Sequence, residues 1–456
     1  MNKTAATPNT PTLGLVSLGC SKNAVDLQVM TGHLVTAGFA LAPETDTADV
    51  ILVNPCAFIQ AAREEAAAEI LRACELKKTG SVRAVVVSGC FAQRYGEQLT
   101  EAFPDVDAWV GIDALDSIVQ IVKGVLKSRD EILFNVDDTV PCRVFNPPVP
   151  ALRFTSVAFA YLKIAEGCAH KCAYCAIPGI RGKYRSRPLA ALVKEAKELL
   201  ATGVKELNVI AQDPMLYGVD IKPNAKGEKT TLVTLLKALD KLPGEFWVRV
   251  LYSYPSEITA DFLAWMNTSP HAVKYIDVPL QHTDPVILKA MARGGAVKAT
   301  LAAAEHLRAA VPGVTLRTTV MTGFPGEDDA SFQKLLSDVK TMKFDHLGAF
   351  AFSPEEGTAA EKLPNRPDIK IARKREKMVM TAQKRVWSVK AKSMVGETYP
   401  ALVVADGIAR MASQAPDVDG VVYLKKKSRQ ALPPVGSFVS VKLVEVQEYD
   451  FVAEVV

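Results

Sequence analysis

Cys168, Cys172 and Cys175 lie on one short segment, Glu166–Cys175 (EGCAHKCAYC), which follows an apolar run typical of a strand. Three thiolates on one loop can hold one face of a metal centre. A structural zinc site would need a fourth ligand, and His170 is tethered too tightly between the cysteines to supply it easily. The spacing C-x₃-C-x₂-C therefore favours a [4Fe–4S] cluster with one iron left open to another ligand.

Three further cysteines share one local context although they lie far apart in the sequence. Cys20, Cys56 and Cys90 each end an apolar run (LGLVSLGC, ILVNPC and VVVSGC) and each precede a helical pattern. A lone cysteine is more often a small buried hydrophobe than a ligand. The ends of parallel strands, however, meet at one edge of a sheet, where helix N-termini favour negative charge. We therefore expect these cysteines to form a second three-cysteine site. Cys74, in mid-helix, is expected to be structural, and Cys142 is assigned no role.

Composition limits the classes of protein that need to be considered. The chain has 456 residues and a net charge of +4, which does not by itself indicate a nucleic-acid binder. The first eleven residues form a polar tail without the apolar region of a signal peptide, and no apolar run is long enough to span a membrane. Eight cysteines without a secretion signal favour a reducing, cytoplasmic setting in which thiols serve metals or catalysis.

The N-terminal third alternates strand-like and helical segments. Strands are expected at Leu13–Leu18, Val50–Val53 and Ala84–Ser88, and Ala61–Lys78 is a strong helix by its Ala, Glu and Leu content. This alternation predicts a parallel sheet covered by helices. The proline-rich segment Val140–Pro150 then marks a linker.

After the linker the strand–helix alternation resumes with longer units. Expected strands are Ala158–Ile164, Glu206–Ile210, Trp247–Leu251, Tyr275–Val278, Leu316–Met321 and Leu347–Phe352, with helices that include Leu189–Ala201, Thr231–Lys241 and Asp328–Lys343. Six such units predict an incomplete (β/α)6 barrel rather than a closed eight-fold one. Its chemistry is expected at the carboxyl ends of the strands.

The last part of the chain does not continue the strand–helix alternation. A basic helix is expected over Ile369–Met394, followed by short strands at Pro400–Val404, Gly420–Leu424, Phe438–Val446 and Phe451–Val456. This pattern suggests a small antiparallel β-barrel. The expected domains are 11–130 (α/β with three cysteines), 131–152 (linker), 153–386 (barrel) and 387–456 (small β-barrel).

The C-x₃-C-x₂-C segment resembles the signature of radical S-adenosylmethionine (SAM) enzymes. With the three-cysteine α/β domain and a TRAM-like β-barrel, nearly the whole chain resembles the methylthiotransferases of that superfamily. The resemblance implies a first [4Fe–4S] cluster on Cys20, Cys56 and Cys90 that carries the sulfur to be transferred. It implies a second [4Fe–4S] cluster on Cys168, Cys172 and Cys175, which binds SAM and cleaves it after reduction by an electron donor. It also places Tyr174 near the adenine of SAM, although ordinary loop packing would explain an aromatic residue there.

Other candidate contacts for SAM or substrate follow from their expected positions at the ends of barrel strands or, for Arg317, on the fifth strand. They are Gln212 with Asp213, His282, Arg317, Gly323 and Glu327. His282 could equally cap a helix or lie in the core, and ordinary turn formation would explain Gly323–Glu327. Arg181–Arg187 (RGKYRSR) could pair with a carboxylate of SAM or substrate, or could be a solvated loop.

Two substrates are compatible with the resemblance: an aspartate of ribosomal protein uS12, or an adenosine in tRNA. Several stretches, including Leu18–Asp26, Glu166–Arg187 and Ala415–Gly420, resemble the uS12 branch of the family. Eight acidic and six basic residues give Gly396–Val456 a net charge of −2, which suits a basic ribosomal protein better than RNA. The basic helix and Lys425–Lys427, in contrast, favour binding of RNA. We expect uS12 to be the substrate; tRNA, or a non-enzymatic iron–sulfur or zinc protein, are the alternatives.

Overall fold

The N-terminal unit is a six-stranded parallel sheet, in which the three predicted cysteine-bearing strands are neighbours. The computed structural model describes residues 10–127, 132–137, 141–143, 152–153, 156–426 and 431–456. The strands of this sheet, in spatial order, are β2 (Ala40–Leu41), β1 (Thr12–Ser17), β3 (Val50–Asn54), β4 (Ala84–Ser88), β5 (Ala108–Val110) and β6 (Leu133–Asn135). Much of the predicted linker 131–152 lies outside the described residues, but Leu133–Asn135 within it form β6, so the N-terminal unit continues past the expected boundary at 130.

Helices cover both faces of this sheet because its strand side chains alternate between two cores. The helices are α1 (Ser21–Thr36), α2 (Gln60–Lys78), α3 (Cys90–Tyr95), α4 (Gln98–Ala102) and α5 (Ile118–Lys127). Val50 and Leu52 pack with α1 and α5 on one face, whereas Ile51 and Val53 pack with α2 and α3 on the other. Cys74 is buried in the second core, in agreement with its predicted structural role.

The central unit is a half-open barrel of six parallel strands. They are β7 (Phe159–Lys163), β10 (Glu206–Ile210), β11 (Trp247–Val250), β12 (Tyr275–Asp277), β13 (Thr315–Thr322) and β14 (His346–Ala351). The first three and the last three each form a parallel sheet. The two sheets are joined where the Ser253 N–H donates to the Asp277 carbonyl at 2.8 Å. Among the described strands, no ladder joins β7 to β14, so the barrel is incomplete as predicted.

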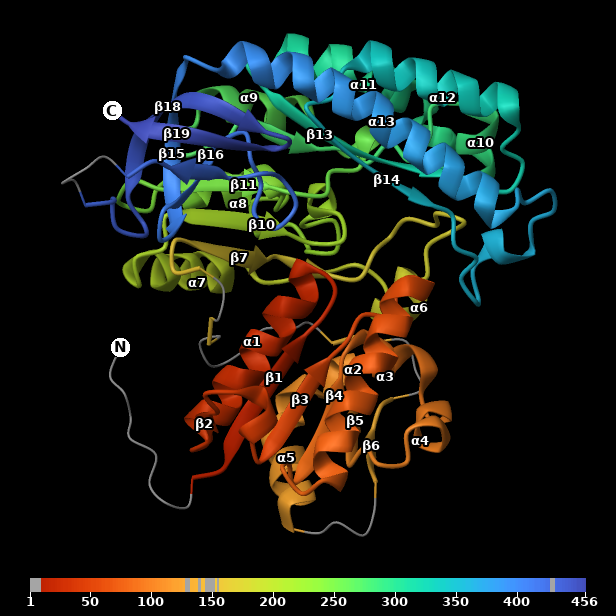
Figure 1. Cartoon of the computed structure of the whole chain (residues 1–456), viewed down its shortest axis with the longest axis vertical. Helices are drawn as coiled ribbons and strands as arrows, with labels where there is room; N and C mark the ends of the chain where they lie inside the picture. The colour runs from red at the N-terminus through yellow and green to blue at the C-terminus, as the bar shows by residue number, and fades with distance from the viewer. Residues whose placement is uncertain (1–9, 128–131, 138–140, 144–151, 154–155, 427–430) are drawn as a thin grey trace.

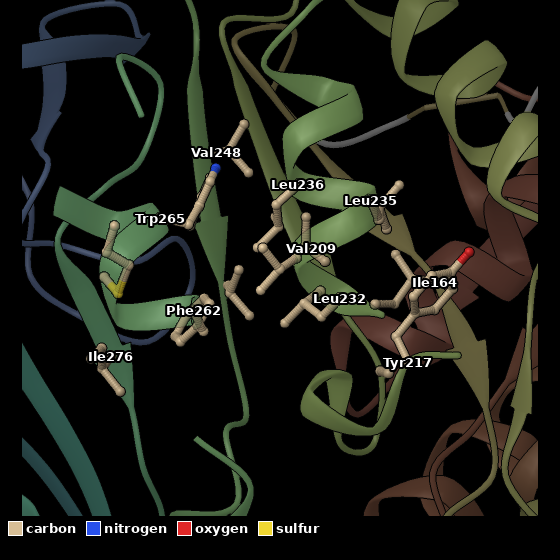
Figure 2. Packing of buried hydrophobic residues seen from close by; sticks show 14 of the residues in the cluster. Ile164, Val209, Tyr217, Leu232, Leu235, Leu236, Val248, Phe262, Trp265 and Ile276 are labelled. Carbon is tan, nitrogen blue, oxygen red and sulfur yellow. The ribbon is translucent and has the colours of Figure 1, made fainter. Parts of the chain in front are cut away.

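The outer helices pack on this sheet through one large apolar core. They are α7 (Leu189–Ala201), α8 (Leu232–Leu239), α9 (Ala260–Thr268), α10 (Pro285–Ala290), α11 (Val297–Ala310) and α12 (Asp329–Met342). Figure 2 shows Leu232, Leu235 and Leu236 of α8 packing beside Val209 and Val248 of the sheet. A short hairpin of β8 (Ala165–Glu166) and β9 (Arg185–Ser186) with α6 (Ile177–Arg181) lies between β7 and α7.

The C-terminal unit is a closed five-stranded barrel entered through a long helix, α13 (Ile369–Met394). Its strands are β15 (Thr398–Ala405), β16 (Ile408–Met411), β17 (Val422–Leu424), β18 (Phe438–Gln447) and β19 (Asp450–Val455). One pair, β17 with β19, is parallel, and the other pairs are antiparallel as predicted. The expected boundary at 386/387 falls inside α13, where Trp387 and Ala391 pack in the core of this barrel.

A loop of the C-terminal barrel, residues 412–420, packs against inward-facing residues of the central barrel. Ala415 is fully buried in a core with β7 and β12. Asp417 accepts a hydrogen bond from the Tyr161 hydroxyl at 2.5 Å. Asp419 pairs with Arg317 at 2.6 Å and accepts from the Tyr275 hydroxyl at 2.7 Å. The loop of the C-terminal barrel therefore contacts β7, β12 and β13 on the inner side of the half-open central barrel.

Candidate active site

All six cysteines of the two predicted sets line one cavity. The cavity has a volume of about 750 Å³ and lies where the N-terminal unit covers the mouth of the half-open barrel. In Figure 1 the N-terminal unit lies below the barrel, with α1 and α6 at the boundary between the two. Residues of the C-terminal loop, from Pro416 to Val418, complete the wall. All three units of the chain thus contribute to one internal space.

The N-terminal cysteines meet because their strands are parallel and adjacent. Cys20 precedes the first residue of α1, Cys56 follows β3, and Cys90 is the first residue of α3. Gly19 has a positive φ of 90°, and a Cβ built on it would lie 2.5 Å from the Cβ of Cys56. Glycine is therefore required at this position for Cys20 and Cys56 to approach each other.

Gly19→Ala should disturb the N-terminal cysteines more than its backbone strain alone explains. A suitable control is Gly38→Ala, because Gly38 has a similar φ of 97° and a Cβ added to it would meet nothing within 4 Å. The control should lose about 1 kcal/mol of unfolding free energy, whereas Gly19→Ala should lose about 1–3 kcal/mol more through the clash with Cys56. Chemical unfolding of both variants tests this; equal losses would contradict it.

The second cysteine set is held by contacts on both sides of its loop. The Ala173 N–H donates to the Met291 carbonyl at 3.0 Å, which ties the middle of the loop to the end of α10. His170 contacts Asp213 at 2.6 Å through Nε2 and stacks on Tyr254 at 3.8 Å. His170 is thus held by a carboxylate and an aromatic ring in the cavity wall.

Arg293 lies directly behind this loop. Its guanidinium lies over the Tyr254 ring at 4.1 Å and is 3.8 Å from the Cys172 sulfur and 3.4 Å from the Tyr174 hydroxyl. It also donates to the Pro279 carbonyl at 2.8 Å, which anchors it to the end of β12. A buried cation next to three thiols favours negative charge on the sulfur-bearing loop.

The chemistry of the donor set fits an iron–sulfur cluster, since the cysteines that line the cavity come in two sets of three and thiolates are the usual cluster ligands. Burial raises the pKa of the Cys90 and Cys175 thiols to about 12, and that of Cys168 to about 11. A bound iron centre would reverse this preference, since metal-bound thiols lose their protons.

The cavity wall also contains buried polar atoms without partners. They are Gln212 Oε1, Gln281 Oε1 and Arg293 Nε, and all three side chains line the cavity. Buried polar atoms are nearly always hydrogen-bonded in native proteins, so these indicate a polar ligand. SAM, with its amino, carboxylate and adenine groups, has the donors and acceptors that such a wall requires.

A buried network of charges joins the two cysteine-bearing units. Arg181 pairs with Glu166 of the barrel and Asp26 of α1, each at 2.9 Å, and its Nε donates to the Cys90 sulfur at 3.1 Å. Lys163 of β7 pairs with the same two carboxylates. Burial alone would raise the pKa of Glu166, but Arg181 and Lys163 lower it well below its usual range. The network is neutral overall and fixes the first cysteine set against the second.

Comparisons with known proteins agree with this geometry over almost the whole chain. Residues 12–111 match the uncharacterized protein family UPF0004, residues 162–339 match the radical SAM superfamily, and residues 395–456 match the TRAM domain. A protein of Syntrophus aciditrophicus (strain SB), named ribosomal protein uS12 methylthiotransferase RimO, is 39% identical over 97% of this chain and 98% of its own. A protein of the same name from Clostridioides difficile (strain 630) is also 39% identical, with the same coverage. The chain belongs to the uS12 methylthiotransferase family.

A solved structure supports the fold of this family member. The radical SAM methyltransferase TsrM from Kitasatospora setae, with cobalamin and a [4Fe–4S] cluster bound, superimposes with a TM-score of 0.52. The match covers 77% of this chain and 74% of that one at 14% identity, so it supports the fold alone.

None of the described helices combines the length and the apolar character that a membrane span requires.

The predicted SAM contacts of this methylthiotransferase family member fall into two groups. Tyr174, Gln212 and Arg317 line the cavity. The lining does not include His282, Gly323 or Glu327, which instead contact one another behind the wall. Glu327 accepts from the Gly323 N–H at 2.9 Å, and its other oxygen lies 3.3 Å from His282 Nε2.

Helix α13 packs behind these three residues and holds them in the layer that supports the cavity wall. Arg375 of α13 donates to the Glu327 carboxylate at 2.7 Å, and a Cβ on Gly323 would clash with that of Ala372. Gln281, the neighbour of His282, faces the cavity instead, because its φ of 70° turns the chain at the end of β12. Position alone could not decide between Gln281 and His282.

Several cavity residues gave no signal in the sequence. Tyr252, Asp277 and Arg293 come from separate segments of the barrel and meet through its fold, whereas Lys22 joins them only through the docking of the N-terminal unit; no chemical role for any of the four was predicted. The segment Arg181–Arg187 was expected to meet a ligand carboxylate or solvent; its arginines are buried against protein groups. Arg187, for example, pairs with Glu195 at 2.6 Å.

Proposed function

We propose that the chain transfers a methylthio group to an aspartate of ribosomal protein uS12. The observation that carries this proposal is the convergence of two three-cysteine sets on one cavity. A carbon radical must meet its sulfur donor before it is quenched, and a shared, enclosed space provides that proximity. One set alone would support SAM cleavage but would leave no site for the sulfur to be transferred.

In this proposal the two cysteine sets have different roles. Cys168, Cys172 and Cys175 would hold the [4Fe–4S] cluster that binds SAM, and Cys20, Cys56 and Cys90 would hold the [4Fe–4S] cluster that carries sulfur. When bound, these groups supply radical generation from SAM, given a reducing electron donor, and a methylated sulfur. The chain's own residues hold the two groups in register and exclude water.

The cavity-lining candidates can be assigned to SAM by their chemistry. Tyr174 lines the cavity and is supported from behind by the buried Phe324 ring, edge to face at 6.5 Å, so the Tyr174 ring offers a surface for adenine. Gln212 is fixed by donating to Glu166 at 3.1 Å, which leaves its free carbonyl oxygen to accept from a ligand. Arg317 is held by Asp419 and can orient a carboxylate. His282, Gly323 and Glu327 would support SAM binding indirectly, through the wall that they stabilise.

The proposed division of the chain assigns 11–130, together with β6 from the segment 131–152, to the sulfur-bearing unit, 153–386 to the radical SAM barrel and 387–456 to the TRAM barrel. The buried network of Arg181 and the loop 412–420 would keep these units together around the substrate. Because the proposed substrate is a ribosomal protein, we place the activity in the cytoplasm.

Deleting the gene should remove one methylthio group from uS12. Intact-protein mass spectrometry of uS12 from cells with and without the gene measures this directly. Nucleoside analysis of tRNA from the same cells provides the control for the alternative substrate. Unchanged uS12 together with the loss of a methylthiolated nucleoside would overturn the proposal.

A further inference from the structure

Lys22 is a buried cation in the cavity, and among the described residues its attraction to a carboxylate is the one to Asp277, which lies beyond ion-pair distance. Its side chain is only 7% exposed, and it lines the same cavity as the six cysteines. In the described part of the chain, no ion pair joins it to an acidic residue. Burying an ammonium group without a counter-ion costs several kcal/mol, so such groups are normally paired.

The contacts of Lys22 with the protein compensate only part of this cost. Its ammonium lies 3.0 Å from the centroid of the Tyr252 ring, and such a cation–π contact replaces only part of the hydration that a buried ammonium loses. Asp277 also lines the cavity, but its carboxylate accepts from the Tyr252 N–H at 3.3 Å and lies 3.9 Å from Arg317. Arg317 and the Tyr252 N–H thus hold Asp277, and Lys22 attracts it only from beyond ion-pair distance, so the ammonium of Lys22 retains capacity for an anion.

The position of Lys22 in α1 points the same way. It is the second residue of a sixteen-residue helix whose first turn contains no acidic residue. A cation there is unfavourable, because the helix dipole places partial positive charge at the N-terminus. The side chain of Cys20 at the N-cap makes no capping hydrogen bond, so the first backbone N–H groups are available as well. Lys22 and these N–H groups together form a site for an anion.

We propose that Lys22 binds the carboxylate of the target aspartate. This inference rests on the proposed function and identifies how the substrate is recognised. Lys22 is two residues from Cys20, so a carboxylate held at Lys22 brings the adjacent carbon of the same side chain next to the sulfur-bearing set. Tyr252 of the barrel fixes the ammonium across the boundary, which is where the two reacting groups must meet.

Lys22→Met should abolish the preference of the protein for aspartate over asparagine. The probe is a labelled uS12 peptide containing the target aspartate, and a second peptide with asparagine at that position. Anaerobic fluorescence anisotropy measures the affinity of each for the protein loaded with both clusters. The parent protein should bind the aspartate peptide about 10- to 100-fold more tightly, since a hydrogen bond to a charged group contributes about 1.5–3 kcal/mol. In Lys22→Met the ratio should fall to about 1.

Lys197→Met is the matched control, because Lys197 is exposed on α7. This variant should prefer the aspartate peptide over the asparagine peptide as strongly as the parent protein does. Lys22→Gln repeats the measurement if the methionine variant does not fold. An unchanged ratio in these Lys22 variants would overturn the inference. So would a larger loss of SAM affinity than of peptide affinity, which would assign the anion site to the carboxylate of SAM.

The same experiment separates this inference from the proposed function. If the parent protein prefers the aspartate peptide through Lys22 but never methylthiolates it, the proposed function fails and the anion site stands. If the parent protein methylthiolates the peptide and Lys22→Met keeps the preference, the site fails and the function stands. Absence of binding to either peptide by the parent protein would overturn both.

Discussion

Cys20→Ala should abolish methylthio transfer while SAM cleavage continues. Cys20, Cys56 and Cys90 form one wall of the cavity, and loss of one thiol should prevent the first cluster from being held. The second set in the lining, Cys168, Cys172 and Cys175, is unchanged. Because outer-sphere changes already reduce metal-site function by about 10- to 100-fold, loss of a ligand should reduce transfer at least about hundredfold.

Three measurements together test this result. Iron analysis after anaerobic reconstitution should give about eight irons per chain for the parent protein and about four for Cys20→Ala. Chromatography should still detect 5′-deoxyadenosine, and mass spectrometry should find no methylthiolated uS12. Cys74→Ala is the control, because Cys74 is buried in the N-terminal core away from the cavity, and it should keep both clusters and transfer. Loss of SAM cleavage in a folded Cys20→Ala protein with its second cluster intact would contradict the division of roles.

Arg181→Met should destabilise the contact between the N-terminal unit and the barrel by about 3–5 kcal/mol, the usual result of removing one partner from a buried ion pair. Arg181 is only 1% exposed and holds Glu166, Asp26 and the Cys90 sulfur at once. The variant would leave two buried carboxylates with Lys163 as their remaining cation. Chemical unfolding measures the change in free energy.

Lys194→Met is the control for the Arg181 prediction, because Lys194 pairs with Glu198 on the exposed surface of α7. It should change the unfolding free energy little, since exposed ion pairs contribute little to stability. An Arg181→Met protein as stable as this control would show that the network does not fix the units. Because Glu166 has a lower pKa folded than unfolded, its stabilising contribution is present at neutral pH and is lost as the pH falls through the folded-state pKa.

The sequence predicted the parts of the site that depend on strand order. Cys20, Cys56 and Cys90 were expected to meet because parallel strands share an edge, and the structure places all three in one cavity. The bounds of α7 and α13 were predicted residue for residue, since both helices are long and regular. The short strand β16 was missed, because four residues between two turns carry too little periodicity.

The parts that depend on docking between units could not be predicted. Lys22 meets Tyr252, and Arg181 meets Cys90, across sequence separations that no local pattern links. The insertion of the 412–420 loop into the central barrel likewise depends on tertiary contacts of Ala415 and Asp419. The direction of side chains was also not predictable: His282 was expected at the cavity, but its neighbour Gln281 lines it instead.

Reconstitution with purified components tests the proposed reaction most directly. The protein loaded anaerobically with both clusters is incubated with SAM, a reductant and purified uS12, and tandem mass spectrometry then locates any added mass on the uS12 sequence. We expect one methylthio group on a single aspartate, and none with Cys20→Ala. SAM cleavage with unmodified uS12, or a methylthio group on tRNA added to the same mixture instead, would contradict the assignment.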